Sequence, residues 1–287
     1  MEARLLFLHA LSPLHAGTGQ GVGVIDLPIA REKATNIPYL PGSSLKGVLR
    51  DACTEPKLRD RVFGPDSTQA EEYAGSVQIT DMRLLFLPVR SLSGTFAWVT
   101  SPFLLERFKR DIANVPNLLP LSPLPKPSAD TACAVSDQGC ELVMQLSNQR
   151  KVVLEDLDLT PESSAAVKGW AAWLGGHLFP TDTYWQSALL ARFCVVSDNV
   201  FSFLLTTATE ITARIQLEPD KKTVKRGALW YEEALPAETI LSGLVVATSV
   251  QSNPTEVFAT IKNATDSPLQ VGGNATIGRG FCQMRMV

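Results

Sequence analysis

Disulfide pairing and zinc binding have little support in this chain, because its cysteines are few and poorly spaced for either. The 287 residues include five cysteines, an odd number, and no Cys-x-x-Cys pair occurs. A disulfide framework and a structural zinc site are therefore not expected. Reduced, mostly buried thiols and a cytoplasmic location are expected instead. No apolar run reaches the ~18 residues of a membrane helix, so no membrane partner is predicted.

Charged residues are also scarce. They make up 19% of the chain, and the formal net charge is −3, whereas an ordinary soluble domain carries about 25% charged residues. Hydrophobic residues reach 45%, which excludes a disordered chain. An acidic protein has no global basic field, so any RNA or DNA site must be a local cluster of cations. The low charge further indicates a surface that partners partly cover.

The common enzyme motifs are missing. The chain has three histidines and neither a Gly-x-Ser-x-Gly nor a His-Glu-x-x-His motif, which argues against a hydrolytic triad and a zinc peptidase. The glycines at 17, 19, 21 and 23 do not fit a dinucleotide fingerprint. A second glycine-rich stretch, 272–280, ends in Arg-Gly and lacks the Lys-Ser/Thr of a nucleotide-binding phosphate loop.

Hydrophobic periodicity predicts an α+β protein. The expected strands span residues 4–11, 77–89, 192–196 and 241–247, with short strands near 131–136 and 140–154, and the expected helices span 42–51, 101–112, 161–174 and 254–264. Residues 211–217 and 224–230 are typical of the two arms of a β-hairpin. The order strand, helix, strands, helix, strand matches a ferredoxin-like βαββαβ unit, the frame of RNA-recognition modules, here split by large insertions.

Two basic segments are candidate RNA contacts. The helix at 42–51 begins after a glycine, with Ser43 or Ser44 as a possible N-cap and with Lys46 and Arg50 one turn apart. Helix N-termini attract phosphate. Between residues 31 and 61 the chain has seven basic residues, Arg31 among them, and four acidic ones. The alternative is a solvated helix face with ordinary capping.

The hairpin tip and the second glycine-rich stretch offer further RNA contacts. The tip is basic, and the arm that follows it, Ala228-Leu-Trp-Tyr, places aromatic rings where bases stack. The backbone N–H groups of the glycine-rich stretch can form an anion-binding concavity. A solvated tip and a simple turn are the alternatives. The candidate RNA-binding residues in these two segments are Lys225, Arg226, Gly272, Gly273, Gly278, Arg279 and Gly280.

Several stretches together resemble one known family. They are residues 15–33, which begin His-Ala-Gly-Thr-Gly-Gln-Gly-Val-Gly, residues 38–51, which contain Pro-Gly-Ser-Ser-Leu-Lys-Gly, and residues 227–236 and 272–280. The chain resembles the backbone subunits of type III-B CRISPR effector complexes, the Cmr family of the repeat-associated mysterious protein (RAMP) superfamily. The resemblance covers the whole chain and is weakest over residues 114–158.

The resemblance implies an architecture and a set of partners. It implies a single RAMP domain, with a ferredoxin-like palm at about 1–100 and 237–287, an insertion at about 101–208 and a β-hairpin thumb at about 209–233. Copies of the chain would stack in a filament along a guide CRISPR RNA, beside other effector subunits. The thumb would interrupt pairing between the guide and a complementary target RNA, so that the target is cut at regular intervals.

The resemblance also assigns roles to residues. Asp26 falls on the family's target-cleavage residue, and His15, Tyr231 and either Glu232 or Glu233 fall near the cleavage centre. Ser43, Lys46 and Arg50 become guide contacts. Without the resemblance, a loop aspartate such as Asp26 is more often a turn former.

RNA carries its own nucleophile, the 2′-hydroxyl, which attacks the adjacent phosphate once a flipped nucleotide reaches in-line geometry. An aspartate, with a pKa of about 3.9 in water, is a weak base at neutral pH. Asp26 is therefore expected to bind a divalent metal, Mg²⁺ or Mn²⁺. Two alternatives stay open: a non-catalytic guide-RNA scaffold, and an endonuclease that processes CRISPR repeats with His15 as base.

Overall fold

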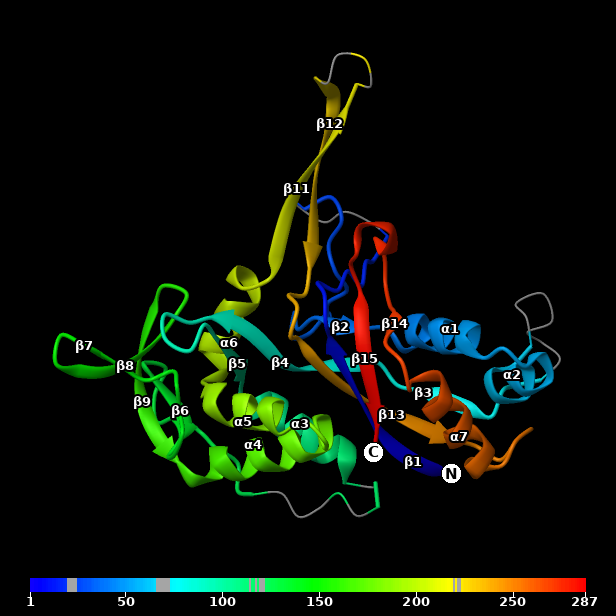
Figure 1. Ribbon diagram of the computed structural model, residues 1–287, viewed down its shortest axis with the longest axis horizontal. Coiled ribbons are helices and arrows are strands. Elements are labelled where there is room, and N and C mark those ends of the chain that lie inside the picture. The colour runs from blue at the N-terminus through cyan, green and yellow to red at the C-terminus, as the bar shows by residue number, and fades with distance from the viewer. Residues whose placement is uncertain are drawn as a thin grey trace.

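A large sheet with one projecting hairpin forms this protein (Figure 1). The computed structural model describes residues 1–19, 25–65, 73–113, 115, 116, 118, 122–218, 220 and 223–287. Within these residues the sheet has 13 strands and is mostly antiparallel; the pairs β5–β10 and β6–β9 are parallel. The prediction of an α+β protein is confirmed at the level of a mixed fold of helices and a large, mostly antiparallel sheet.

The order of strands across the sheet places the chain's two ends together. From one edge it runs β14 (Leu269–Gln270), β15 (Phe281–Met286), β1 (Glu2–Ala10), β13 (Ile240–Ala247), β4 (Met82–Arg90), β5 (Phe96–Thr100), β10 (Phe193–Val196), β6 (Ala132–Ser136), β9 (Leu157–Ser164), β8 (Gln149–Leu154) and β7 (Met144–Leu146). Two short strands lie off this path: β2 (Tyr39–Leu40) pairs with β4, and β3 (Val77–Ile79) pairs with β13. The sheet continues from β4 through β5 into β10, so the predicted division into palm and insertion stays a prediction.

Helices cover both faces of the sheet, which is why β1 is apolar at successive positions. Leu6 and Leu8 belong to one buried cluster, with residues of α1 (Gly42–Ala52), α2 (Pro56–Phe63), α6 (Asp198–Thr207) and α7 (Pro254–Ala264). Leu5 and Phe7 belong to a second, with residues of α3 (Pro102–Ile112), α4 (Ala165–Leu178) and α5 (Thr183–Arg192). Alternate side chains of a strand point to opposite faces, so β1 is buried from both sides. No helix in the described ranges has the length and apolar character needed to span a bilayer.

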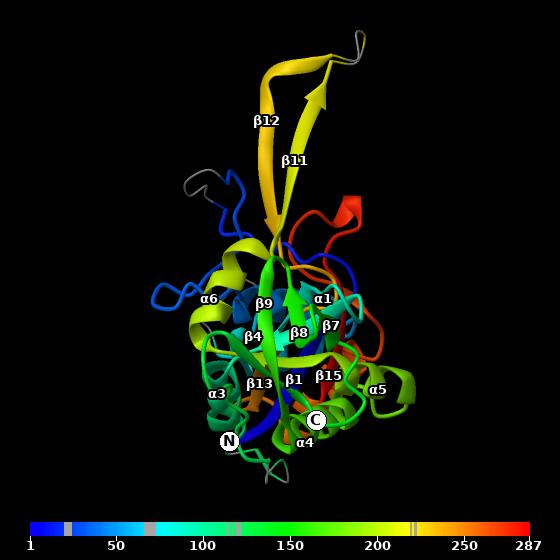
Figure 2. The same cartoon turned by 90° about the vertical axis from the view of Figure 1, so that its left-hand side faces the viewer.

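The predicted hairpin is present as β11 (Glu210–Leu217) and β12 (Val224–Ala234), a separate two-stranded sheet that stands away from the body (Figures 1 and 2). Its large apolar side chains are solvent-exposed: Ile211, Ile215, Leu217, Val224, Leu229 and Tyr231. An isolated hairpin with exposed apolar residues is marginal by itself, so it is suited to packing against a partner. Lys221, Lys222 and the side chain of Arg226 lie outside the described residues.

Several predicted boundaries were wrong. The helix expected at 161–174 begins at Ala165, where Ser164 accepts a hydrogen bond from the N–H of Val167, and Pro161 lies in β9 opposite Cys133. The strand expected at 77–89 is two strands. A further helical 3-10 turn, η2 (Ala275–Ile277), lies in the second glycine-rich stretch.

Candidate nucleic-acid interface

Asp26 lies at the foot of the hairpin. Its Oδ2 accepts a hydrogen bond of 2.8 Å from the N–H of Tyr231 on β12. The next residue, Leu27, donates to the Tyr231 carbonyl (3.0 Å) and accepts from the N–H of Glu233 (3.0 Å). The loop therefore pairs with the edge of β12 that faces away from β11, and this pairing presents the exposed Asp26 carboxylate beside the hairpin.

Glu233 also fixes this loop, through hydrogen bonds from Ile29 and Arg31. Its Oε2 accepts the N–H of Ile29 (3.1 Å), while Oε1 accepts Arg31 Nη2 (2.5 Å) and Thr209 Oγ1 (3.1 Å). Only 3% of Glu233 is exposed. Burial and three hydrogen bonds on its two oxygens favour a positioning role for Glu233 in holding the Asp26 loop.

His15 is enclosed beside the same strand. Its Nδ1 lies 2.6 Å from the carbonyl oxygen of Glu233. A carbonyl only accepts, so Nδ1 carries a hydrogen and Nε2 is the nitrogen left to act as a base when the ring is neutral. A Cβ at Gly17 would lie 2.6 Å from Nε2, and one at Gly272, whose φ is +78°, would lie 2.4 Å from the His15 carbonyl oxygen. The two glycine-rich stretches thus close around His15.

The four predicted catalytic residues therefore gather in one place, through contacts that sequence spacing does not reveal. Asp26 and Glu233 are both hydrogen-bonded to the loop–hairpin junction, and His15 contacts Glu233. The Tyr231 hydroxyl has no hydrogen-bond partner among the described residues, and 37% of this residue is exposed. Their catalytic roles stay predictions.

Glu232, the alternative to Glu233 that the resemblance offered near the cleavage centre, is held by hydrogen bonds at the base of the hairpin. It is 5% exposed and accepts hydrogen bonds from Trp230 Nε1 (2.9 Å), Asn274 Nδ2 (3.1 Å) and Arg214 Nε (3.3 Å). It thereby ties both arms of the hairpin to the second glycine-rich stretch.

The N-terminus of α1 is capped differently from the prediction. Neither Ser43 nor Ser44 is the N-cap; that position is Pro41, whose side chain makes no capping bond, and Asp81 Oδ1 accepts the N–H of Gly42 (2.8 Å). The turn between β3 and β4 packs tightly here, since a Cβ at Gly42 would lie 2.4 Å from the carbonyl oxygen of Ile79. Asp81 already offsets the positive end of the helix, which leaves the exposed Ser43 and Ser44 hydroxyls and nearby cations as the groups that the predicted phosphate contact would use.

Among the predicted RNA-binding cations, most are engaged within the fold. Arg50 donates to the carbonyl of Gly64 and, at 3.0 Å, to Asp60 Oδ1, and Arg31 is held by Glu233. Lys46 has no ion pair within the described residues. Burial lowers its pKa, and the nearby Arg50 guanidinium lowers it further. Lys46 is therefore a half-buried cation available to an anion, and Lys225 is an exposed one on β12.

The second glycine-rich stretch does not offer the free N–H groups expected of it. The N–H groups of Gly273, Gly278 and Gly280 donate to the carbonyls of His15 (2.9 Å), Ala275 (3.0 Å) and Pro13 (2.8 Å). Arg279 is 8% exposed and donates to Thr212 Oγ1 (3.0 Å). The expected concavity of free N–H groups is wrong at these three glycines, because two of the N–H groups bond to the 13–15 segment and that of Gly278 bonds within its own turn. Whether the loop touches RNA stays a prediction.

The loop that follows Asp26 is fixed to the body at a second point. Glu32 accepts two hydrogen bonds from Arg107 of α3 and one from Thr35. Burial by itself raises the pKa of Glu32, but the hydrogen bonds from Arg107 and Thr35 outweigh it and leave the pKa below its usual value. The carboxylate thus stays ionised, and the Asp26 loop is anchored at both the hairpin and α3.

Comparisons with protein families, curated proteins and solved structures identify relatives of the same family. A family model described as the RAMP superfamily matches residues 7–283. The "CRISPR system Cmr endoribonuclease Cmr4" of Pyrococcus furiosus is 34% identical over 302 residues, which span 100% of this chain and 96% of the relative. The crystal structure of oligomeric Cmr4 from Pyrococcus furiosus has a TM-score of 0.72 at 28% identity, covering 100% of this chain and 99% of that one.

A more distant structure shares the fold alone. A chain of the type III-B Cmr-beta complex bound to cognate target RNA, determined by cryo-EM, has a TM-score of 0.75 at 20% identity and covers 100% of this chain and 97% of its own. The resemblance inferred from the glycine-rich motifs is confirmed. With a family match over almost its whole length and a full-length relative at 34% identity, the chain belongs to the RAMP superfamily.

Proposed function

We propose that this chain is the repeating backbone subunit of a type III-B CRISPR ribonucleoprotein, where it binds guide RNA and cleaves complementary target RNA. The observation that carries the proposal is the exposed Asp26 carboxylate, presented at the foot of a projecting hairpin, in a chain similar over its full length to a Cmr endoribonuclease. Cleavage of complementary RNA by an assembled complex, with and without Asp26→Asn, tests it.

The strand order supports a ferredoxin-like palm. The strands β15, β1, β13 and β4 are neighbours in that order and antiparallel throughout, with α1 between β1 and β4 in sequence and α7 between β13 and β15. This arrangement corresponds to a βαββαβ unit, the frame of RNA-recognition modules. We assign the β11–β12 hairpin as the thumb.

Base pairing with the guide selects the target in this proposal, and the protein supplies geometry. The thumb unstacks one nucleotide of the duplex, so that its 2′-hydroxyl lines up with the adjacent phosphate. Attack forms the new oxygen–phosphorus bond, and the 5′-oxygen of the next nucleotide leaves. The products are a 2′,3′-cyclic phosphate and a 5′-hydroxyl. Asp26, fixed through Tyr231 and Leu27, faces this step.

A divalent cation fits Asp26 only as a weakly held ion. Over the described part of the chain, no three His, Cys, Asp or Glu side chains lie close enough together to hold a metal. Magnesium characteristically keeps several waters and binds one or two carboxylates together with substrate phosphates. Asp26 would hold Mg²⁺ or Mn²⁺ together with the RNA, and the ion would stabilise charge that develops on the phosphate.

Two other functions make different predictions. A pure scaffold binds guide RNA but never cuts, and a repeat-processing endonuclease cuts guide precursor as an isolated chain. The second needs an accessible base, yet His15 is only 7% exposed and lies beneath the two glycine-rich stretches. Incubation of the isolated chain with repeat RNA separates this alternative from the proposed function.

Guide binding is expected to depend on Lys46. Replacing Lys46 with alanine should weaken guide RNA binding to a similar degree for all sequences and lower the slope of log K against log salt by about one unit. The reason is that this cation has no ion pair within the described part of the chain. Filter binding over a salt series measures both quantities. Lys168→Ala, at a lysine that makes a solvent-exposed bond to Gln138 on the insertion, is the matched control, and an unchanged slope for Lys46→Ala contradicts the assignment.

The thumb is expected to set the spacing of the cuts. Replacing residues 220–225 with a short Gly-Ser link should leave the body folded, because hairpin tips tolerate change. It should abolish regularly spaced cleavage, since nothing then unstacks the duplex. Denaturing gels of end-labelled target RNA report the spacing. Evenly spaced cuts by a complex built from the shortened subunit would mean that another element bends the RNA.

A further inference from the structure

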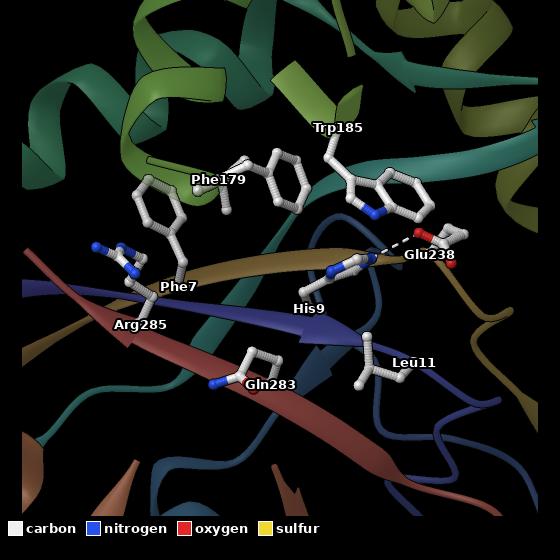
Figure 3. A pocket seen from close by; sticks show the side chains of 9 residues that line it. Phe7, His9, Leu11, Phe179, Trp185, Glu238, Gln283 and Arg285 are labelled. Atoms are coloured by element: carbon white, nitrogen blue, oxygen red, sulfur yellow. Dashed lines mark hydrogen bonds and ion pairs between the residues drawn. The ribbon is translucent and has the colours of Figure 1, made fainter. Parts of the chain in front are cut away.

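A small cavity lies between β1, β15 and the turn that joins α4 to α5 (Figure 3). Its volume is about 220 Å³. Ring side chains form most of its walls: Phe7, His9, Phe179 and Trp185. Two charged side chains, Arg285 and Glu238, lie at its opposite ends (Figure 3). None of the residues that line it belongs to the Asp26 site, so the cavity is a separate feature of the molecule.

The Glu238 end of the cavity is rigidly built. His9 Nε2 lies 2.6 Å from Glu238 Oε2, and Trp98 Nε1 donates to the Glu238 carbonyl (2.9 Å). Glu238 has a φ of +71°, a conformation that costs energy for a glutamate and persists only where the surroundings enforce it. The His9 ring also packs edge-on against Phe179 and Trp185. The cavity is therefore preformed.

His9 presents a hydrogen-bond acceptor to the cavity. A carboxylate only accepts, so Nε2 carries the hydrogen of the neutral ring and Nδ1 is the acceptor. Nδ1 points away from Glu238, toward the Arg285 end of the cavity (Figure 3), and no donor to it exists among the described residues. His9 is only 8% exposed. Since a buried acceptor without a donor costs free energy, a ligand that brings an N–H group into this cavity would satisfy it.

The opposite end of the cavity is basic. Arg285 is exposed, and its side chain makes no hydrogen bond or ion pair within the described residues. A second hollow of about 140 Å³ shares Gln283 and Arg285 with the cavity, so the two meet at the edge of β15. It is also lined by Lys262, exposed and likewise without an ion pair in the part of the chain that the structure describes, and by one carboxylate, Asp266. Two cations exceed this one acid, so this end of the cavity attracts an anion.

The chemistry of a nucleotide matches both ends of the cavity. Aromatic walls favour a planar base, because every base has a π-face that stacks on aromatic side chains. Bases carry N–H groups at their edges, one of which can donate to His9 Nδ1. Small-molecule sites usually start at about 300 Å³, so the smaller volume here holds a base and leaves the ribose and phosphate at the mouth. An arginine such as Arg285 can bind a phosphate there through two parallel hydrogen bonds.

We propose that the cavity binds a nucleotide, with the base against Phe179 and Trp185 and the phosphate on Arg285. Lys262 adds a second positive charge beside the phosphate. The nucleotide comes either as a free monophosphate or as an unpaired residue of an RNA strand, and the two sources share the same chemistry. The site goes beyond the proposed function, because neither pairing with a target nor Asp26 takes part in it.

Calorimetric titration of the purified chain, without guide or target RNA, tests the site. The probes are AMP, UMP, adenosine, inorganic phosphate and 4-hydroxybenzoate, an aromatic acid that lacks ribose and phosphate. AMP and UMP should bind with dissociation constants of about a millimolar or below. Adenosine should bind at least about tenfold more weakly than AMP, because it lacks the charge that Arg285 binds. Inorganic phosphate, which has no base to stack, should also bind more weakly than AMP.

Substitutions at the two ends of the ligand separate phosphate from base. Arg285→Gln should weaken AMP binding at least about tenfold and leave adenosine binding unchanged, which also shows that the variant is folded. Arg285→Lys keeps the charge and should retain part of the affinity. Leu11→Trp, at a rim position that is 39% exposed, should weaken AMP and adenosine alike by filling the mouth of the cavity. Arg90→Gln, at an arginine whose side chain is 73% exposed elsewhere on the sheet, is the control and should change neither.

Four results would overturn the nucleotide site: no binding of AMP at its highest soluble concentration, equal affinities for AMP and adenosine, an Arg285→Gln chain that binds AMP like the wild type, or tighter binding of 4-hydroxybenzoate than of AMP. Competition by a single-stranded tetranucleotide identifies the source of the ligand. If it displaces AMP more readily than UMP does, the ligand is RNA, and if less readily, the free nucleotide; both outcomes support the site. Because no target RNA is present, none of these results bears on cleavage at Asp26, which the assembled complex tests separately.

Discussion

Target cleavage by a complex built from the Asp26→Asn subunit is expected to be at least about a hundredfold slower than by the wild type, a loss of about 2.7 kcal/mol of transition-state stabilisation. Asparagine keeps the side-chain oxygen that accepts the Tyr231 N–H, so the loop should stay attached to β12. Only the negative charge is removed. Assembly, guide affinity and target affinity should therefore be unchanged, and a time course with end-labelled RNA in magnesium measures the rate.

A charge-removing substitution elsewhere on the surface is the control for Asp26→Asn, and two results would contradict the prediction. Asp137→Asn removes one negative charge from an exposed turn outside the hairpin region and should leave cleavage intact. If Asp26→Asn cuts at the wild-type rate, Asp26 only shapes the loop and the reactive group must be sought at His15 or Tyr231. If neither the wild type nor the variant cuts target RNA in the presence of any divalent metal, the chain is a scaffold and the enzyme proposal fails.

Removal of the metal should reproduce the Asp26→Asn phenotype. EDTA is expected to stop cleavage by the wild-type complex while target binding persists, because base pairing and not the ion holds the target. Added Mg²⁺ or Mn²⁺ should restore the rate. Cleavage that continues in EDTA would show that Asp26 acts without a divalent metal, and the proposed metal site would be wrong.

The elements that sequence could predict are those with strong local signals. The helix at 254–264 was placed at its observed bounds, because Pro254 occupies its first position and Asn253 caps it through Glu256 N–H (2.9 Å). The hairpin was recognised from its two apolar arms. By contrast, the helices α5 and α6 were not predicted. Their N-cap residues, Asp182 and Ser197, are of the preferred types, but the apolar residues of both helices run on into the neighbouring strand β10 without a break in pattern.

The sequence identified residues that lie together in the structure, but it did not identify the contacts that hold them there. The family motif selected Asp26, His15, Tyr231 and Glu233. Their roles depend on partners far away in sequence: Glu233 meets Arg31 across 202 positions, and Asp81 reaches Gly42 across 39. No local pattern reports such pairings. This is why Arg50 was predicted as an RNA contact although Asp60 and Gly64 engage it, and why the serines of α1 were predicted as caps.

Glu233 provides the sharpest test of positioning against chemistry. Glu233→Ala would leave the Arg31 guanidinium, 18% exposed, and the N–H of Ile29 without their acceptor. Breaking a buried pair on one side costs about 3–5 kcal/mol, so the free energy of unfolding should fall by that order and cleavage should fall with it. Chemical denaturation and the cleavage time course are the two measurements. Thr206→Ala, which removes only one hydroxyl hydrogen bond at an exposed position of α6, is the control.

A paired replacement separates the two roles of Glu233. In Arg31→Met with Glu233→Gln both charges are absent, so no buried charge is left unpaired, and the glutamine oxygen can still accept the N–H of Ile29 that holds the loop. If Glu233 only positions the Asp26 loop, the paired variant should regain most of the stability lost in Glu233→Ala, and cleavage should recover with it, because Asp26 still hydrogen-bonds to Tyr231. If Glu233 transfers a proton or binds the metal, stability should return but cleavage should not. Recovery of folding with cleavage still a hundredfold down would therefore restore Glu233 to the catalytic residues, beside Asp26.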